Sequence, residues 1–211
     1  MRPYHLYVVT DEVVSGGRSH TSIAEAAVSG GADVVQLRDK GMQGGMMLQV
    51  AESIRAATVG KDTLFIVNDR LDIALLSGAD GVHLGQDDIP VSKARDITPP
   101  GFIIGVSAGN LEEALRAEEE GADYVGLGPI FPTGSKDDAG PACGLESLRE
   151  VSEALSIPVV AIGGISFENA ADVVKAGAKG LAVISAVLRS EDITSSCREL
   201  KGLITGQMPS E

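Results

Sequence analysis

The chain has 211 residues, of which 17 are Lys or Arg and 30 are Asp or Glu, so its formal net charge is −13. This length suits one domain, or at most a small pair, with a sizeable core, and an apolar fraction of 44% excludes wholesale disorder. The negative charge disfavours a general binder of nucleic acid or of anionic membrane, because both would repel it. An anionic substrate would need cations placed locally.

The N-terminal segment and the two cysteines point to a reducing compartment. One early cation, Arg2, precedes a short apolar run that lacks a small-residue cleavage site, so no signal peptide is predicted. No stretch approaches the roughly 18 apolar residues of a membrane span. Cys143 and Cys197 form neither a CxxC pair nor a disulfide framework. We therefore predict a soluble cytoplasmic protein.

Short apolar runs rich in Val and Ile recur along the chain, and a helical pattern follows each of them. The runs are nearly continuous in apolar residues, which is typical of parallel strands buried on both faces. We expect eight strands: Tyr4–Thr10, Val34–Arg38, Leu64–Asn68, Gly81–Leu84, Phe102–Ser107, Tyr124–Pro129, Val159–Gly163 and Gly180–Ser185.

Helices are expected between these runs. The segments Ser22–Glu25 and Asn110–Glu113 carry the residue pattern of a capping box, which predicts a helix start at each. In the stretch 145–155, apolar residues at i, i+3 and i+4 spacings share one helical face. Ser166, after the seventh strand, is a further expected helix start.

A weak repeat supports an alternating architecture. The repeat begins Gly31-Ala32-Asp33, Gly78-Ala79-Asp80, Gly121-Ala122-Asp123 and Gly177-Ala178-Lys179. Each glycine is expected to end a helix in a left-handed conformation just before a strand. Eight strands alternating with helices predict an α/β fold, a single-domain (β/α)8 TIM barrel over residues 1–211. An open doubly wound sheet is the alternative, but no GxGxxG follows the first strand.

The polar residues that follow the strands are the candidate site, because the C-terminal strand ends carry the active sites of such barrels. Asp69 and Asp88 follow neighbouring strands and could hold Mg²⁺, which commonly takes one or two carboxylates besides phosphate and water oxygens. Alternatively, Asp69 pairs with Arg70, and Asp88 caps a helix.

Two further groups could bind anions. Gln36, Arg38 and Lys40 alternate along an extended segment and so share one face, which suits an anion plus a ring heteroatom. The pair Gly163-Gly164 would let backbone N–H groups approach a phosphate beside a helix start, with Ser185 closing the same site. A solvated loop and a plain tight turn are the respective alternatives.

The remaining features are weaker. Residues 132–141 are glycine-rich and polar and indicate a mobile lid, or else a plain solvent loop. His83 is interpreted as a buried histidine with satisfied hydrogen bonds, while His5 and His20 carry no signal. No Cys-His or Ser-His-Asp spacing supports nucleophilic catalysis.

Taken together, these residues resemble the thiamine phosphate synthase family. The matching motifs run in family order: Tyr7–Asp11, Gln36–Lys40, Asn68–Arg70, Gly81–Asp88, Gly105–Ser107, Gly126–Thr133, Ala161–Ile165 and Ile184–Ala186. The resemblance implies a transferase that joins a hydroxymethylpyrimidine pyrophosphate to a thiazole phosphate, releasing pyrophosphate by a dissociative mechanism. It also implies small-molecule substrates, Mg²⁺ as cofactor and a homodimer.

The resemblance assigns roles to individual residues. Asp69 and Asp88 would hold Mg²⁺ against the pyrophosphate, which Arg38, Lys40, Asn68 and Lys136 would bind. Gln36 would orient the pyrimidine, and Ser107 would contact the pyrimidine or the pyrophosphate. The thiazole phosphate would be held by Thr133, Ser135, Gly164, Ile184 and Ser185. Arg38, Lys40, Lys136 and Ser107 would be the catalytic residues.

The sequence departs from the family pattern twice. Ser135 stands where Thr is common, and Gly109 stands where His is frequent. Two other functions are therefore considered: a thiazole tautomerase on the same barrel, and a non-catalytic thiamine-phosphate-binding regulator. The tautomerase would not need the pyrophosphate and metal residues, and it too has His where Gly109 stands.

Overall fold

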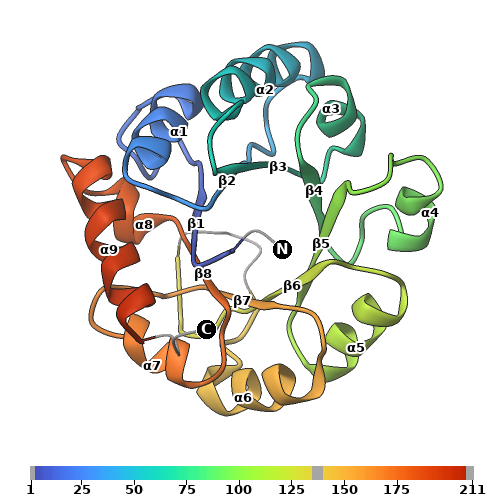
Figure 1. Ribbon diagram of the computed structural model, residues 1–211, viewed down its shortest axis with the longest axis vertical. Helices are drawn as coiled ribbons and strands as arrows, with labels where there is room; N and C mark the ends of the chain where they lie inside the picture. Colours follow the sequence, from blue (N-terminus) through green and yellow to red (C-terminus); the bar gives the residue numbers. More distant parts are fainter. Residues whose placement is uncertain (1–2, 135–139, 208–211) are drawn as a thin grey trace.

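The computed structural model describes residues 3–134 and 140–207, and within them eight parallel strands close into a barrel (Figure 1). The strands are β1 (Leu6–Val9), β2 (Val34–Leu37), β3 (Leu64–Asn68), β4 (Gly81–Leu84), β5 (Ile103–Ala108), β6 (Tyr124–Leu127), β7 (Val159–Ile162) and β8 (Gly180–Val183). Each strand pairs with its neighbour in sequence, and β1 pairs with β8 to close the ring. The predicted TIM barrel is confirmed.

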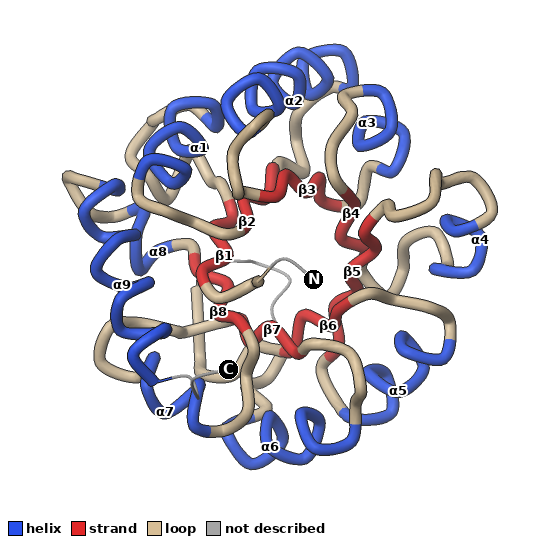
Figure 2. The backbone as a smooth tube through the Cα atoms, in the orientation of Figure 1, coloured by secondary structure: helices blue, strands red, loops and turns tan. Residues whose placement is uncertain are grey.

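Helices surround the strands as an outer ring (Figure 2). They are α1 (His20–Ser29), α2 (Gly44–Thr58), α3 (Leu71–Leu76), α4 (Val91–Arg95), α5 (Leu111–Glu119), α6 (Gly144–Ala154), α7 (Ala170–Lys175), α8 (Ser185–Leu188) and α9 (Ile193–Gln207). The strands are almost wholly buried, because their outer side chains pack against the helices and their inner side chains fill the barrel.

The repeated glycines end the helices as predicted. Gly31, Gly78, Gly121 and Gly177 have φ values of +85°, +66°, +94° and +110°, a region that side chains with a Cβ rarely adopt. Each of these glycines lies between a helix and the strand that follows it, and turns the chain back so that this strand runs parallel to the others.

Two predicted helix starts are wrong and one is confirmed. Helix α1 begins before Ser22, because Ser19 is extended and its hydroxyl accepts a hydrogen bond from Ser22 N. Helix α7 begins at Ala170 instead of Ser166, because the Asn169 side chain holds the preceding turn by accepting from Ser166 N. Asn110 does cap α5, since its side-chain oxygen accepts from Glu113 N at 2.9 Å.

Candidate active site

A cavity of about 390 Å³ opens at the C-terminal ends of the strands. The sequence-predicted residues that line it are Arg38 and Lys40 after β2, Asn68 and Asp69 at β3, Asp88 after β4, Ser107 on β5 and Thr133 after β6. The barrel therefore brings together residues from five strands, and the predicted anion and metal residues share one cavity.

Asp69 and Asp88 face each other in this cavity. Burial, together with hydrogen bonding to the Asp88 carboxyl and repulsion from its charge, raises the pKa of Asp69 to about 6, although Lys40 and Arg38 oppose the rise. Asp69 also has φ +59°, a left-handed conformation that is uncommon for residues other than glycine and often marks functional sites. The protein thus holds two carboxylates close together despite their mutual repulsion.

The alternative structural roles for these two carboxylates are wrong. Arg70 forms a bidentate pair with Asp72, with N–O distances of 2.8 and 2.6 Å, so it does not neutralise Asp69. Asp88 caps no helix, because its Oδ2 accepts from Gly85 N at 2.6 Å and Pro90 occupies the N-cap of α4. Both Asp69 and Asp88 line the cavity.

The donor chemistry of this pair fits a hard divalent cation. Mg²⁺ prefers oxygen ligands and commonly takes only one or two carboxylates, with phosphate and water oxygens completing the octahedron. Within residues 3–134 and 140–207, no group of three or more His, Cys, Asp or Glu side chains could enclose a metal ion. The two carboxylates therefore suit an ion shared with an anionic substrate better than an ion held by the protein alone.

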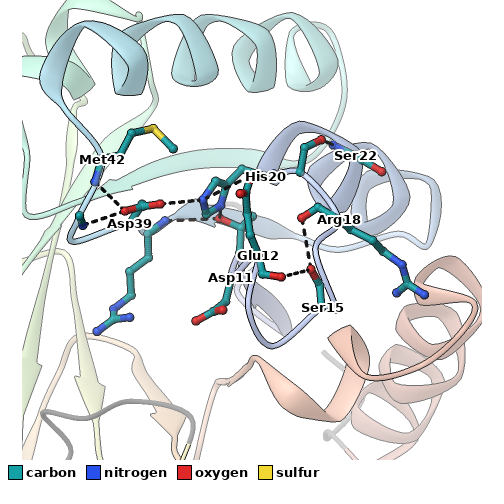
Figure 3. Close-up of polar contacts among 12 residues, drawn as sticks. Asp11, Glu12, Ser15, Arg18, His20, Ser22, Asp39 and Met42 are labelled. Atoms are coloured by element: carbon teal, nitrogen blue, oxygen red, sulfur yellow. Dashed lines mark hydrogen bonds and ion pairs between the residues drawn. The ribbon is translucent and has the colours of Figure 1, made fainter.

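The loop after β2 is anchored by a buried histidine that the sequence analysis missed (Figure 3). His20 is 2% exposed; its Nδ1 lies 2.7 Å from Thr10 Oγ1, and its Nε2 lies 3.3 Å from Asp39 Oδ2. The other Asp39 oxygen accepts from the backbone N–H groups of Gly41 and Met42, both at 2.8 Å. Asp39 stands between the predicted anion-binding residues, so His20 helps to fix the loop that carries them.

Gln36 lies deeper than predicted. It is 2% exposed and is not among the described residues that line the cavity. Its side-chain nitrogen donates instead to the Tyr7 hydroxyl inside the barrel, at 2.6 Å. Alternation places Gln36 on the same face of the segment as Arg38, but one step deeper in the barrel, so only Arg38 and Lys40 of the three line the cavity.

His83 has the satisfied, largely buried environment that was predicted. It is 9% exposed, with Nδ1 2.9 Å from Tyr124 Oη and Nε2 2.8 Å from Ser107 Oγ. The second contact also ties His83 to a predicted site residue, because Ser107 is half-buried and lines the cavity.

A second, smaller cavity of about 30 Å³ adjoins the first. Its lining includes Thr133, Gly164, Ile184 and Ser185, the four described residues predicted to hold the thiazole phosphate. The two cavities have Thr133, Ile162 and Gly163 in common. The predicted residues for two separate anions therefore line two adjoining spaces.

The glycine pair is required by packing and by its backbone conformation. Gly163 and Gly164 have φ values of +96° and +65°, and a Cβ on Gly164 would lie 2.6 Å from Phe131 Cβ. Asn169 Nδ2 donates to Gly164 O at 2.9 Å and fixes the turn. The expected helix start beside the pair is absent, because residues 167–169 form a turn before α7.

Parts of the predicted site lie outside the described residues. Ser135 and Lys136 belong to this group, and so does the central part of the predicted lid, 132–141. Gly140, at the far side of that segment, lines the larger cavity. Gly109 N donates to the Glu113 carboxylate at 2.7 Å, so the position where the family often has His serves the start of α5 here. Across the described residues, no helix has the length and apolar character needed to cross a membrane.

Comparison with known proteins identifies the family. The family model described as "Thiamine monophosphate synthase" matches residues 6–187. The chain is 58% identical to a thiamine-phosphate synthase from Methanoculleus marisnigri, covering 95% of both chains. It is 50% identical to a thiamine-phosphate synthase from Chloroflexus aurantiacus, covering 96% of this chain and 93% of the relative.

A solved structure agrees with these relatives. The thiamine phosphate pyrophosphorylase from Pyrococcus furiosus superposes with a TM-score of 0.91 at 42% identity, covering 99% of this chain and 98% of that one. The match extends over the whole barrel and includes the strand ends that form both cavities. The chain therefore belongs to the thiamine monophosphate synthase family.

Proposed function

We propose that this protein joins 4-amino-2-methyl-5-hydroxymethylpyrimidine pyrophosphate to hydroxyethylthiazole phosphate, giving thiamine phosphate and pyrophosphate. The observation that carries the proposal is the pair of adjoining cavities. One has two cations and three carboxylates in its lining, including the facing pair Asp69 and Asp88; the other has the glycine turn and Ser185, and Thr133 contributes to both. This arrangement suits two anionic substrates that react where their sites meet.

The larger cavity suits the pyrimidine pyrophosphate. Arg38, Lys40 and Asn68 would bind the pyrophosphate oxygens, together with Lys136 from outside the described residues. Asp69 and Asp88 would hold Mg²⁺, which when bound would neutralise charge on the leaving pyrophosphate. Gln36 would orient the pyrimidine from its position in the barrel interior, beneath the cavity.

The smaller cavity suits the thiazole phosphate. The glycine turn lines this cavity, where its backbone N–H groups would bind a phosphate, and Ser185 adds a hydroxyl. Thr133 lies where the cavities join and would contact the thiazole phosphate, with Ser135 and Ile184 completing the set.

The chemistry required of the protein is electrostatic. In a dissociative mechanism the pyrophosphate leaves first and a pyrimidine cation forms, so the cations near the leaving group lower the barrier. The thiazole nitrogen is already nucleophilic and needs no base. The protein would orient the second substrate and exclude water, which would otherwise capture the cation.

Two other activities compete with this proposal. A thiazole tautomerase would use only the smaller cavity, and a regulator would bind thiamine phosphate without turnover. The synthase is favoured because the cations and the paired carboxylates gather in the larger cavity, where neither alternative uses them. We further propose a cytoplasmic enzyme with small-molecule substrates and no nucleic-acid partner, in keeping with the −13 charge, and a homodimeric state.

One assay tests the proposal. Purified protein is incubated with both substrates and Mg²⁺, and thiamine phosphate is measured as its oxidised fluorescent product. Product that requires both substrates and is abolished by a chelator supports the synthase. Folded protein that yields no product rules the synthase out. Isomerisation of a thiazole phosphate tautomer without the pyrimidine substrate would identify a tautomerase, and thiamine-phosphate binding without turnover would identify a regulator.

A further inference from the structure

A continuous chain of hydrogen bonds crosses the interior of the barrel beneath the larger cavity. Gln36 Nε2 donates to Tyr7 Oη at 2.6 Å, and Tyr7 Oη lies 2.8 Å from Tyr124 Oη. Tyr124 Oη lies 2.9 Å from His83 Nδ1, and His83 Nε2 lies 2.8 Å from Ser107 Oγ. The chain begins at a buried amide and ends at a hydroxyl that lines the cavity.

The barrel is shaped around this chain. Tyr124 is fully buried, and a Cβ on Gly105 would lie 2.0 Å from its ring. A Cβ on Gly126 would lie 2.9 Å from His83 Cε1. Two strand positions therefore have no side chain where the Tyr124 ring and the imidazole need the space. A buried polar network is costly unless every member is hydrogen-bonded, so this one is held in a defined arrangement.

The direction of the chain follows from its first member. An amide N–H can only donate, so Tyr7 Oη accepts from Gln36 and its own proton must go to Tyr124. Tyr124 then donates to His83 Nδ1, which must be an unprotonated acceptor. The single proton of a neutral His83 ring therefore lies on Nε2 and is donated to Ser107 Oγ.

The tyrosines keep their protons under all ordinary conditions. Burial raises the pKa of Tyr7 and of Tyr124 well above the usual value, so both remain donors. A doubly protonated His83 would have to donate to Tyr124 Oη, and the Tyr124 proton, which otherwise goes to Nδ1, would then have no acceptor within the network. Among the described hydrogen bonds of this network, the neutral ring protonated at Nε2 is the form that satisfies every member.

We propose that Gln36, Tyr7 and Tyr124 act as positioning residues that fix His83 as the Nε2–H tautomer and make Ser107 a hydrogen-bond donor toward the cavity. Because Ser107 Oγ already accepts from His83, its own proton is directed to the substrate. This inference rests on the proposed function, in which the nearby ligand is the leaving pyrophosphate. A hydroxyl donor would stabilise the negative charge that grows on that group as it departs.

The tautomer of His83 tests the direction of donation along the hydrogen-bond chain, and the test needs no substrate. The protein has three histidines, so ¹⁵N-labelled protein gives three sets of ring signals in a long-range ¹H–¹⁵N NMR spectrum. His83 is assigned by comparison with His5→Gln and His20→Gln. We expect the Nε2–H tautomer at neutral pH in the substrate-free protein. An Nδ1–H or doubly protonated His83 would overturn the proposal, because the chain would then run the other way or be broken.

Variants at the two ends of the hydrogen-bond chain show which end sets the His83 tautomer. Tyr7→Phe cuts the chain near Gln36 and should give a mixture of His83 tautomers, whereas Ser107→Ala should retain Nε2–H because it removes only the receiving end. Tyr4→Phe is the matched control, since Tyr4 is another buried tyrosine beside Tyr124, with ring centroids 5.0 Å apart, and it lies outside the chain. A tautomer that changes in Ser107→Ala and persists in Tyr7→Phe would contradict the proposal.

Turnover provides the second readout. In the thiamine phosphate assay, Tyr7→Phe should lower kcat about ten-fold, as expected when a hydrogen bond to a charged group is lost. The KM for the thiazole phosphate should stay within about two-fold, and Tyr4→Phe should leave kcat nearly unchanged. Equal kcat in Tyr7→Phe and the parent protein would refute the positioning role. A parent protein with the expected tautomer but no product would refute the proposed function alone.

Discussion

The imidazole of His20 lies 3.3 Å from the carboxylate of Asp39, although the two residues are 19 positions apart in the sequence. His20 begins α1, and Asp39 lies in the loop after β2, so the contact fastens a helix to a loop (Figure 3). The loop carries Arg38 and Lys40 into the larger cavity. A residue outside the cavity therefore helps to determine where the cations stand.

His20→Ala should weaken binding of the pyrophosphate substrate selectively. Loss of one buried and one partly buried hydrogen bond should also lower the free energy of unfolding by about 2 kcal/mol. We expect the KM for the pyrimidine pyrophosphate to rise several-fold while the KM for the thiazole phosphate changes little, measured in the two-substrate assay. His5→Ala is the control, and an equal rise in both KM values would instead indicate general loss of structure.

Asp88→Asn should shift the Mg²⁺ requirement of the reaction. The amide has the same shape but has lost the charge and one acceptor oxygen that a hard cation prefers. The Mg²⁺ concentration that gives half-maximal activity should rise at least about ten-fold. Asp62→Asn is the control, because Asp62 is an exposed carboxylate that does not line the cavity. An unchanged Mg²⁺ titration in Asp88→Asn would remove Asp88 from the metal site.

Asp69→Asn should stabilise the metal-free protein in a pH-dependent way. A carboxyl whose pKa is raised by folding, here to about 6, favours the folded state only at low pH, and this contribution is lost as the pH rises through that value. The free energy of unfolding of Asp69→Asn should therefore increasingly exceed that of the parent protein from about pH 4 to about pH 6, and the difference should then stay constant.

The gain should be about 1 kcal/mol, less than the full pKa shift would give, because the carboxyl is half-buried and partly screened. Asn also tolerates the positive φ of this position, so the substitution adds little backbone strain. Thermal unfolding across this pH range in the presence of a chelator provides the measurement. A difference in stability that is the same at every pH would contradict the assignment.

Gly164→Ala should disturb the smaller cavity and lower stability. Besides the strain of φ +65°, its Cβ would lie 2.6 Å from Phe131 Cβ and 2.9 Å from the carbonyl oxygens of Phe131 and Pro132. We expect the free energy of unfolding to fall by about 2–4 kcal/mol and the KM for the thiazole phosphate to rise. Gly101→Ala has the same backbone strain, at φ +82°, without any contact within 4 Å. Gly101→Ala should therefore lower the free energy of unfolding less than Gly164→Ala does. Equal decreases in the two variants would show that packing against Phe131 is unimportant.

The sequence by itself determined the barrel and most of the larger cavity. The recurring apolar runs and the helix-ending glycines predicted the alternation of strands and helices, and the parallel strands of a barrel must place their C-terminal ends at one face. Asp69, Asp88, Arg38 and Lys40 could therefore be assigned to one site from their positions after the strands alone. Their convergence in one cavity follows from topology, which local patterns are sufficient to predict.

Only the tertiary structure decided which side chains bond to one another. Tyr7 and Tyr124 are 117 positions apart, and no local pattern indicates that their hydroxyls meet inside the barrel. The same holds for His20 with Asp39, and for Gln36, whose amide turns to Tyr7 instead of the cavity. These contacts depend on side-chain direction and on the space left by glycines across the barrel. Such features arise only when distant segments are packed together.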